Sequence, residues 1–194
     1  MISRALIGRR SFLGGSVAAA LGLAWGYARG RAPARADAAS GAPPKMVTIV
    51  EFSDTGERKG TVSVERITKT EKEWKKQLSR EAFEVTRHEG TERPFTNEHP
   101  NGKAKGVFRC ICCETALFNS ETKFESGTGW PSFWAPIAKE NVLEISDRSF
   151  GMVRTAVACR RCDAHLGHVF DDGPQPTGLR YCMNAVAMRF AKAS

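Results

Sequence analysis

The sequence predicts a mainly β protein of the α+β class, with short helices before the sheets and a zinc site that joins two parts of the chain. From Val107 onward, short apolar and aromatic runs alternate with glycine, proline, asparagine and aspartate, which is typical of small antiparallel sheets. Two helix-capping patterns precede this region, and two C-x-x-C pairs lie within it. With 194 residues, 41% hydrophobic and 26% charged, we expect one packed domain plus additional segments.

Residues 1–36 have the pattern of an export signal. A basic start ends in Arg9-Arg10-Ser11-Phe12-Leu13, a mildly apolar stretch runs to about Ala28, and Ala34-Arg35-Ala36 fits a small-residue cleavage site. Twin arginines before such a stretch indicate the bacterial twin-arginine route, which would place the protein in the periplasm. The alternative is an uncleaved membrane anchor, although the apolar stretch is short for a spanning helix.

The net charge of +8 is concentrated in this signal. Six arginines and no acidic residue lie in residues 1–36, which leaves 23 basic and 21 acidic residues in the rest of the chain. That remainder contains no block of lysine or arginine that could follow a phosphate backbone. We therefore expect no nucleic-acid partner.

A linker and a hairpin are predicted next. Residues 37–45 are rich in proline and alanine, as linkers often are. Within residues 46–68, the β-prone runs Met46–Phe52 and Thr61–Ile67 flank the turn-rich segment Ser53–Gly60. This pattern predicts an N-terminal β-hairpin extension.

Two short helices should follow the hairpin. The first opens with the capping-box pattern Thr70-Glu71-Lys72-Glu73 and runs toward Leu78. Ser79 is a suitable cap for a second helix that reaches about His88 and is ended by Gly90.

Four paired cysteines predict a structural zinc site. The pairs Cys110/Cys113 and Cys159/Cys162 are separated by 45 residues, so one ion would tie two distant hairpins together. Four thiolates leave no open coordination position, so this single Zn²⁺ would not activate water. The alternative is that one pair is a redox-active dithiol.

Cys182 is a candidate nucleophile outside these pairs. It lies in Leu179–Asn184, where apolar and polar residues alternate as in a half-buried strand, so Arg180 and Asn184 should share its face. A cation beside a thiol favours the reactive thiolate.

Two histidines lie upstream of this strand, among acidic residues. They are His165 and His168, in the segment Asp163–Gly173. The residues alone leave a second interpretation open, in which Cys182 is an unreactive buried cysteine near two ordinary surface histidines.

Five ordered motifs resemble the B-type methionine sulfoxide reductases. They are Phe108-Arg109-Cys110-x-x-Cys113, Phe124-x-Ser126-Gly127-x-Gly129-Trp130-Pro131-Ser132-Phe133, Cys159-x-x-Cys162, His165-Leu166-Gly167-His168-Val169-Phe170 and Gly178-Leu179-Arg180-Tyr181-Cys182-x-Asn184. Thr91-Glu92-Arg93-Pro94-Phe95 resembles the segment that leads into that domain. The resemblance covers roughly Ile67 to Phe190 and places the enzyme domain at residues 69–194. It implies two small antiparallel sheets, arranged like a tent, with helices at the N-terminal side.

The resemblance also implies an activity, the thiol-dependent reduction of methionine (R)-sulfoxide, in proteins or as the free amino acid. Cys182 would attack the sulfoxide sulfur and be left as a sulfenic acid. The residues expected around the substrate oxygen and the thiolate are His165, His168, Arg180 and Asn184. Trp130 would provide an apolar wall for the substrate methyl group, although without the resemblance core packing is the simpler explanation of a tryptophan. Asp172 would either orient a histidine or belong to an ordinary turn.

One position departs from the family pattern. Many members carry a second, resolving cysteine within the Ser-Gly-x-Gly-Trp-Pro motif, and here that position is Thr128. We therefore expect a thioredoxin-like or other external thiol to reduce the sulfenic acid. The alternative is a disulfide between Cys182 and Cys112, which lies between two expected zinc ligands.

Two other functions fit parts of the sequence. A non-enzymatic zinc-binding interaction module would need the same four cysteines but gives no reason for Cys182 beside Arg180. A zinc-containing oxidoreductase acting on disulfides would need a resolving thiol near Cys182, and the sequence has none adjacent to it. We expect a monomeric enzyme.

Overall fold

The computed structural model describes residues 45–97, 104–147 and 154–194. The predicted signal at 1–36 lies outside the described residues, as does the predicted linker except for Lys45. The described residues all belong to one compact unit. Within the described residues, no helix has the length and apolar character needed to cross a membrane.

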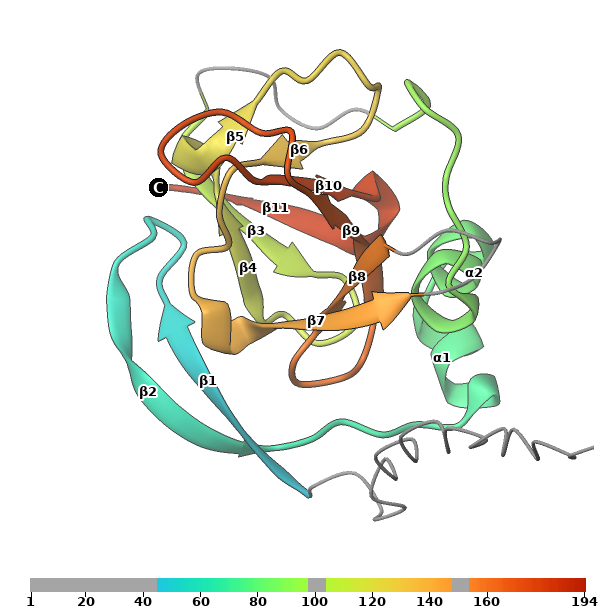
Figure 1. The fold of residues 1–194 in the computed structure, drawn as a ribbon. Coiled ribbons are helices and arrows are strands. Elements are labelled where there is room, and N and C mark those ends of the chain that lie inside the picture. The colour runs from blue at the N-terminus through green and yellow to red at the C-terminus, as the bar shows by residue number, and fades with distance from the viewer. Residues whose placement is uncertain (1–44, 98–103, 148–153) are drawn as a thin grey trace, which may run out of the picture. The chain divides into compact units, whose positions relative to one another are not determined.

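Among the described residues, the strands form three antiparallel sheets (Figure 1). A hairpin of β1 (Met46–Phe52) and β2 (Arg58–Glu65) precedes helices α1 (Glu71–Gln77) and α2 (Arg80–His88). The remaining strands are β3 (Gly106–Cys110), β4 (Ala116–Asn119), β5 (Lys123–Phe124), β6 (Ser132–Phe133), β7 (Val142–Asp147), β8 (Arg154–Cys159), β9 (His165–Phe170), β10 (Arg180–Met183) and β11 (Met188–Lys192). They form a six-stranded sheet in the order β5-β6-β10-β9-β8-β7 and a three-stranded sheet in the order β11-β3-β4. The prediction of a mainly β fold with two antiparallel sheets behind short helices is confirmed.

The predicted hairpin is confirmed, but both boundaries of its second strand differ from the prediction. The first strand ends at Phe52 as expected, but the second begins at Arg58 and ends at Glu65. The ladder continues through Glu51 opposite Gly60 and resumes after a register shift. Arg58 and Gly60, which look like turn residues by composition, are therefore paired with the first strand. Strand pairing is possible here because backbone hydrogen bonds do not require apolar side chains.

A buried asparagine fastens this hairpin to the rest of the unit. Asn141 is fully buried, and its Oδ1 atom accepts a hydrogen bond from the Val50 N–H at 2.7 Å. Its Nδ2 atom donates to the carbonyls of Val50 and Ala116, both at 2.8 Å. Because buried backbone groups are costly to leave unpaired, this side chain makes the hairpin part of the same packed structure.

Both predicted helix starts are confirmed. At α1 the Thr70 hydroxyl accepts from the Glu73 N–H at 3.4 Å, and the Glu73 carboxylate accepts from the Thr70 N–H at 2.8 Å. These reciprocal bonds form the capping box that the sequence predicts. At α2 the Ser79 hydroxyl accepts from the Ala82 N–H at 3.1 Å.

The end of α2 differs in detail from the prediction. The left-handed residue that closes the helix is Glu89, with φ of 56°, rather than Gly90. Gly90 instead donates its N–H to the Glu84 carbonyl at 3.1 Å, and a Cβ at this position would lie 3.0 Å from that oxygen. Glycine is therefore favoured there by the close approach of backbone to backbone.

Aromatic rings join the two larger sheets into one core. Phe133 on β6 stacks on Phe118 of β4 with ring centroids 4.4 Å apart, and meets the edge of Phe108 on β3 at 4.9 Å. All three rings are fully buried. Such pairs add about 0.5–1.5 kcal/mol each beyond the area they bury. The strand β10 that carries Cys182 lies beside β6, so the sheet that holds Cys182 is packed against this core.

Candidate active site and zinc centre

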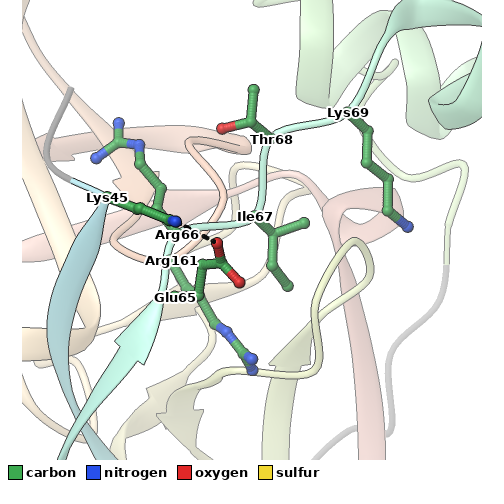
Figure 2. A pocket seen from close by; sticks show the side chains of 7 residues that line it. All are labelled: Lys45, Glu65, Arg66, Ile67, Thr68, Lys69 and Arg161. Atoms are coloured by element: carbon green, nitrogen blue, oxygen red, sulfur yellow. Dashed lines mark ion pairs between the residues drawn. The ribbon is translucent and has the colours of Figure 1, made fainter. Parts of the chain in front are cut away.

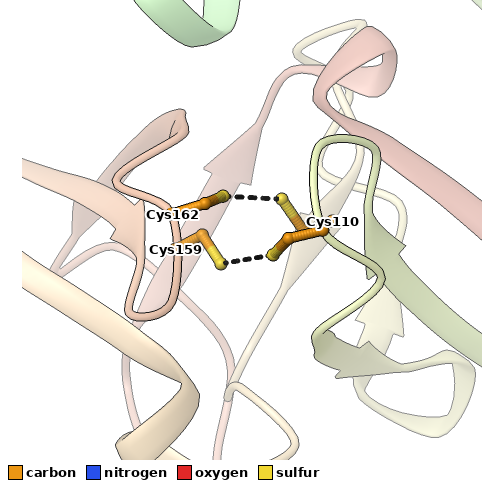
Figure 3. Close-up of side chains that lie close together, drawn as sticks. Cys110, Cys159 and Cys162 are labelled. Carbon is orange, nitrogen blue, oxygen red and sulfur yellow. Dashed lines mark hydrogen bonds between the residues drawn. The ribbon is translucent and has the colours of Figure 1, made fainter. Parts of the chain in front are cut away.

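The four paired cysteines come together at the ends of two hairpins. Their sulfur atoms all lie within 4.8 Å of one another, and Figure 3 shows sulfurs of the two turns facing each other. In each turn the residue after the second cysteine is left-handed, Glu114 with φ of 64° and Asp163 with φ of 55°. The N–H of that residue donates to the carbonyl of the first cysteine at 2.9 Å in both cases.

The donor set fits a zinc ion. A tetrahedron with Zn–S bonds of about 2.3 Å has sulfur atoms about 3.8 Å apart. The Cys110–Cys162 and Cys113–Cys159 sulfur pairs are 3.6 and 3.5 Å apart. Four ionised thiolates this close would repel one another without a cation among them. The predicted structural zinc site is therefore confirmed, with three of its ligands buried and Cys113 partly exposed.

Cys182 lies in the middle of the six-stranded sheet. It is paired with Ser132 on β6 and with His168 on β9, so the three side chains rise from the same face. Cys182 itself is partly exposed, whereas its neighbours Tyr181 and Met183 are buried on the opposite face. The half-buried strand that the sequence predicts is confirmed.

The surroundings of Cys182 both raise and lower the pKa of its thiol. Burial is the largest influence and raises this pKa above its ordinary value. Hydrogen bonding to Thr128, whose Oγ1 atom is 3.9 Å from the sulfur, and the charge of Arg180 oppose that increase. The net shift is upward, so the resting residue is a neutral thiol at neutral pH.

Arg180 is held in place by two groups. Its Nε and Nη2 atoms donate to the two carboxylate oxygens of Asp172, both at 2.8 Å, and its guanidinium lies 4.5 Å from the ring of Phe170. A bidentate pair of this kind fixes the orientation of the guanidinium. Asp172, for which the sequence left a histidine partner or an ordinary turn open, therefore pairs with Arg180.

The two histidines have different environments. His168 is hydrogen-bonded through Nε2 to Asp147 at 3.0 Å, and Asp147 also pairs with Arg154 at 2.9 Å. His165 is buried, and its Nε2 atom has no hydrogen-bond partner among the described residues. Burial, followed by the neighbouring charge of His168, lowers the pKa of His165 to about 4. His165 is therefore a neutral imidazole at neutral pH, 5.3 Å from the ring of His168.

A cavity of about 660 Å³ opens beside these histidines. It is lined by His165 and His168 together with Asp147, Arg154, Ala156 and residues at the end of α2. The cavity therefore brings polar groups and water access to the side of the sheet on which Cys182 lies.

Glu92 links two other predicted site residues. Its backbone N–H donates to the Asn184 Oδ1 atom at 3.0 Å, and its carbonyl accepts from the Trp130 Nε1 atom at 3.1 Å. The Asn184 Nδ2 atom donates to the Leu166 carbonyl at 3.1 Å. The amide of Asn184 is thus committed to backbone groups, while the Trp130 ring is positioned by the Glu92 segment.

A family model, the SelR domain, matches residues 78–192 of the chain. This range includes the four zinc ligands, His165, His168 and Cys182. The chain belongs to the SelR family. Together with the names of the relatives given next, this match confirms the predicted resemblance to the B-type methionine sulfoxide reductases.

Relatives of this SelR family member are similar over most of their own length. A protein from Hahella chejuensis is 55% identical over 130 residues, which cover 67% of this chain and 94% of the relative. Proteins from Pseudomonas syringae pv. syringae and Pseudomonas fluorescens strain Pf0-1 are 54% and 56% identical over 125 residues, covering 64% of this chain and 95% of each relative. All three are named peptide methionine sulfoxide reductase MsrB.

Two residues that position this SelR site were missed by the sequence analysis. Asp147 at the end of β7 binds His168 on β9 across the intervening strand β8, and Glu92 accepts from the Ala185 and Val186 N–H groups at 2.6 and 2.9 Å. Both partners are distant in sequence, so no local pattern could reveal them. The one sequence feature that could have indicated Glu92 is its place in Thr91–Phe95, the segment that resembles the start of the family domain.

A second hollow, of about 520 Å³, does not contain any of the predicted site residues (Figure 2). It is lined by Lys45, Glu65, Arg66, Ile67, Thr68, Lys69 and Arg161. Its cations are partly neutralised, because Lys45 lies 3.9 Å from Glu65 and Arg66 pairs with Asp163. None of the predicted chemistry lies in this hollow.

Proposed function

We propose that this protein reduces methionine (R)-sulfoxide to methionine, with Cys182 as the nucleophile. The observation that carries the proposal is the pairing of a partly exposed Cys182 with His168 on the same face of one sheet. The names of the relatives support the same activity. The choice of the R epimer rests on the family, because each sulfoxide epimer has its own enzyme class.

The first step transfers the sulfoxide oxygen to Cys182. Asp147 stabilises the protonated imidazole of His168, which donates a proton to the sulfoxide oxygen and so makes the sulfur more electrophilic. The Cys182 thiol loses its proton, which restores the proton that His168 gave up. Its sulfur attacks the sulfoxide sulfur, the oxygen passes to Cys182, and methionine leaves as a thioether. Cys182 keeps the oxygen as a sulfenic acid.

Arg180 and Trp130 prepare this step. The guanidinium fixed by Asp172 favours the ionised form of Cys182, which lies two residues away on the same face of β10. Trp130, whose indole N–H is bound by the Glu92 carbonyl, provides the apolar wall for the substrate methyl group. The neutral His165 contributes a buried dipole beside His168 rather than a second charge.

The second step returns Cys182 to its thiol. Thr128 lies 3.9 Å from the sulfur, at the position where a resolving cysteine stands in many relatives, and a hydroxyl cannot form a disulfide. Cys112 is buried between zinc ligands. We therefore assign the reduction of Cys182 to external thiols. One thiol condenses with the sulfenic acid to form a mixed disulfide and releases water. A second thiol attacks this mixed disulfide and releases Cys182 as a thiol. The sum is one sulfoxide and two thiols giving one thioether, one disulfide and one water.

We further propose export through the twin-arginine route, on the basis of Arg9 and Arg10 before the apolar stretch. That route carries folded proteins, so zinc would be bound before export. Replacing both arginines by lysine should retain the protein in the cytoplasm. Unchanged export of that variant would exclude the route.

One assay tests the proposed activity against its alternatives. We expect turnover of the R epimer and not the S epimer with dithiothreitol, and no turnover by Cys182→Ser. The control is Cys112→Ser, which should keep its activity if an external thiol is the reductant. An inactive wild type that still binds zinc would favour a non-enzymatic zinc module.

A further inference from the structure

A positively charged hollow lies where the end of the hairpin meets the second zinc turn, Cys159–Cys162. Its volume of about 520 Å³ is within the usual range for small-ligand sites (Figure 2). The basic residues that line it come from two distant parts of the chain and are Lys45, Arg66, Lys69 and Arg161. Folding therefore gathers like charges in one place, and their mutual repulsion is relieved when an anion lies among them.

Backbone hydrogen bonds hold the walls of this hollow together. The Ile67 N–H donates to the Arg161 carbonyl at 2.8 Å, which joins the hairpin end to the zinc turn. The Arg66 N–H donates to the Lys45 carbonyl, also at 2.8 Å. The basic residues thus belong to one fixed frame, which limits the entropy that is lost when a ligand binds.

The protein compensates these charges only in part. Arg161 pairs with no carboxylate among the described residues, and its buried Nε–H has no hydrogen-bond partner there. The Lys69 ammonium donates at 2.5 Å to the neutral amide of Gln77 rather than to a carboxylate. Arg66 does pair with Asp163. The hollow therefore keeps cationic donors that a further anion can use.

Glu65 is the one acidic residue of the lining, and it is loosely held. Its carboxylate lies 3.9 Å from the Lys45 ammonium, and the side chains of Lys45 and Glu65 are 86% and 68% exposed. An exposed pair at this distance contributes little to stability. An anion can therefore take the place of Glu65 beside Lys45 with little loss of stability.

We propose that this hollow binds a phosphate-type oxyanion, held by Arg161, Lys45 and Lys69. Such an anion accepts several hydrogen bonds at once, and guanidinium and ammonium groups are its usual partners. Thr68 adds a hydroxyl donor to the same lining. Free phosphate or pyrophosphate and the headgroup of an anionic phospholipid all offer this chemistry. The site is independent of the reductase reaction, because none of the proposed catalytic residues lines it.

Variants that change the charge of the hollow test the site in both directions. Arg161→Gln and Lys45→Gln each remove one cation, and Glu65→Gln removes the competing carboxylate. Arg189→Gln is the matched control, since Arg189 pairs with Glu114 outside the hollow. Zinc content and circular dichroism are measured for every variant, because Arg161 lies between two zinc ligands. Lys45 is exposed, so Lys45→Gln keeps the test decisive if Arg161→Gln does not fold.

The zinc-loaded, full-length protein is titrated with pyrophosphate by isothermal titration calorimetry at low ionic strength. We expect saturable binding that Arg161→Gln and Lys45→Gln weaken by roughly tenfold, in line with the loss of one hydrogen bond to a charged group. Glu65→Gln should strengthen the binding, and Arg189→Gln should leave it unchanged.

Sedimentation with vesicles distinguishes the two sources of the anion. The vesicles contain phosphatidylglycerol or, as the neutral comparison, phosphatidylcholine alone. Binding to phosphatidylglycerol vesicles with the same order of variants, and none to pyrophosphate, would assign the site to a lipid headgroup. Binding through another basic segment would not respond to Glu65→Gln. Binding of neither ligand, or binding that the variants of the hollow do not change, would overturn the inference.

Discussion

Cys182 and His168 occupy directly paired positions on the neighbouring strands β10 and β9. Their side chains therefore rise from the same sheet face, although 13 residues separate them in the chain. His168 is in turn bound by Asp147 at 3.0 Å. The sheet thus places the proposed nucleophile, the proposed acid and the carboxylate that binds it on strands rather than on loops.

The pairing predicts that His168 and Asp147 act together. We expect His168→Asn to lower kcat by about 10²–10⁴-fold, the usual loss on removing a general acid. Asp147→Asn should lower kcat less, and the double variant should be no slower than His168→Asn alone, because the carboxylate works through the imidazole. Steady-state kinetics of the three variants measure this, and additive losses would contradict it.

Cys182 should react as a thiol of raised pKa that Arg180 partly restrains. Burial raises its pKa while the nearby guanidinium lowers it, so Arg180→Gln should move the pKa further upward. The pH dependence of Cys182 alkylation by iodoacetamide, followed by peptide mass spectrometry, measures the shift. Arg189→Gln is the matched control, since Arg189 pairs with Glu114. A downward shift in Arg180→Gln would be incompatible with this electrostatic role.

Stability should fall in mild acid because His165 is buried as a neutral ring. Its folded-state pKa of about 4 lies below the ordinary 6.5, so between these values the unfolded chain binds a proton that the folded chain does not. The free energy of unfolding should decrease by about 3 kcal/mol as pH falls from 6.5 to 4.

Urea titrations across this pH range check the decrease. His165→Gln should flatten the acid side of the profile. His88→Gln should not, because Glu84 and Glu71 raise the pKa of His88 in the folded protein. If wild type and His165→Gln lose stability in parallel, His165 is not the group responsible.

Removing a zinc ligand should unfold the domain. Zinc binding contributes about 10–16 kcal/mol in small structural sites, comparable with or above the roughly 5–15 kcal/mol net stability of a domain. We expect Cys159→Ser to lack zinc and to lose its native circular dichroism, whereas Cys112→Ser keeps both. A folded, active Cys159→Ser protein without zinc would refute a structural role for the metal.

Local sequence patterns were sufficient to predict where the helices begin and which residues bind the metal. The capping box at Thr70 and the cap at Ser79 act over three residues, and each C-x-x-C turn fixes its own two ligands, so the sequence contains the whole signal. The alternation around Cys182 likewise predicts one strand and its exposed face.

The positioning contacts could not be predicted in the same way. Glu92 meets Ala185 across 93 residues, and Asn141 meets Val50 across 91. Such partners are set by which strands become neighbours, and register is a property of the folded sheets. Asn184 shows the consequence: alternation placed it beside Cys182, but its amide is bound to Glu92 and Leu166.

The central claim is that the substrate oxygen is transferred to Cys182. The most direct measurement is peptide mass spectrometry of the protein after one equivalent of methionine (R)-sulfoxide, with dimedone present and reductant absent. We predict one dimedone adduct, located on Cys182 and missing in Cys182→Ser. Methionine formed without an adduct on Cys182, or together with a Cys112–Cys182 disulfide in the wild type, would contradict a cycle in which Cys182 alone reacts and an external thiol restores it. An adduct that persists in Cys182→Ser would contradict the assignment of Cys182 as the nucleophile.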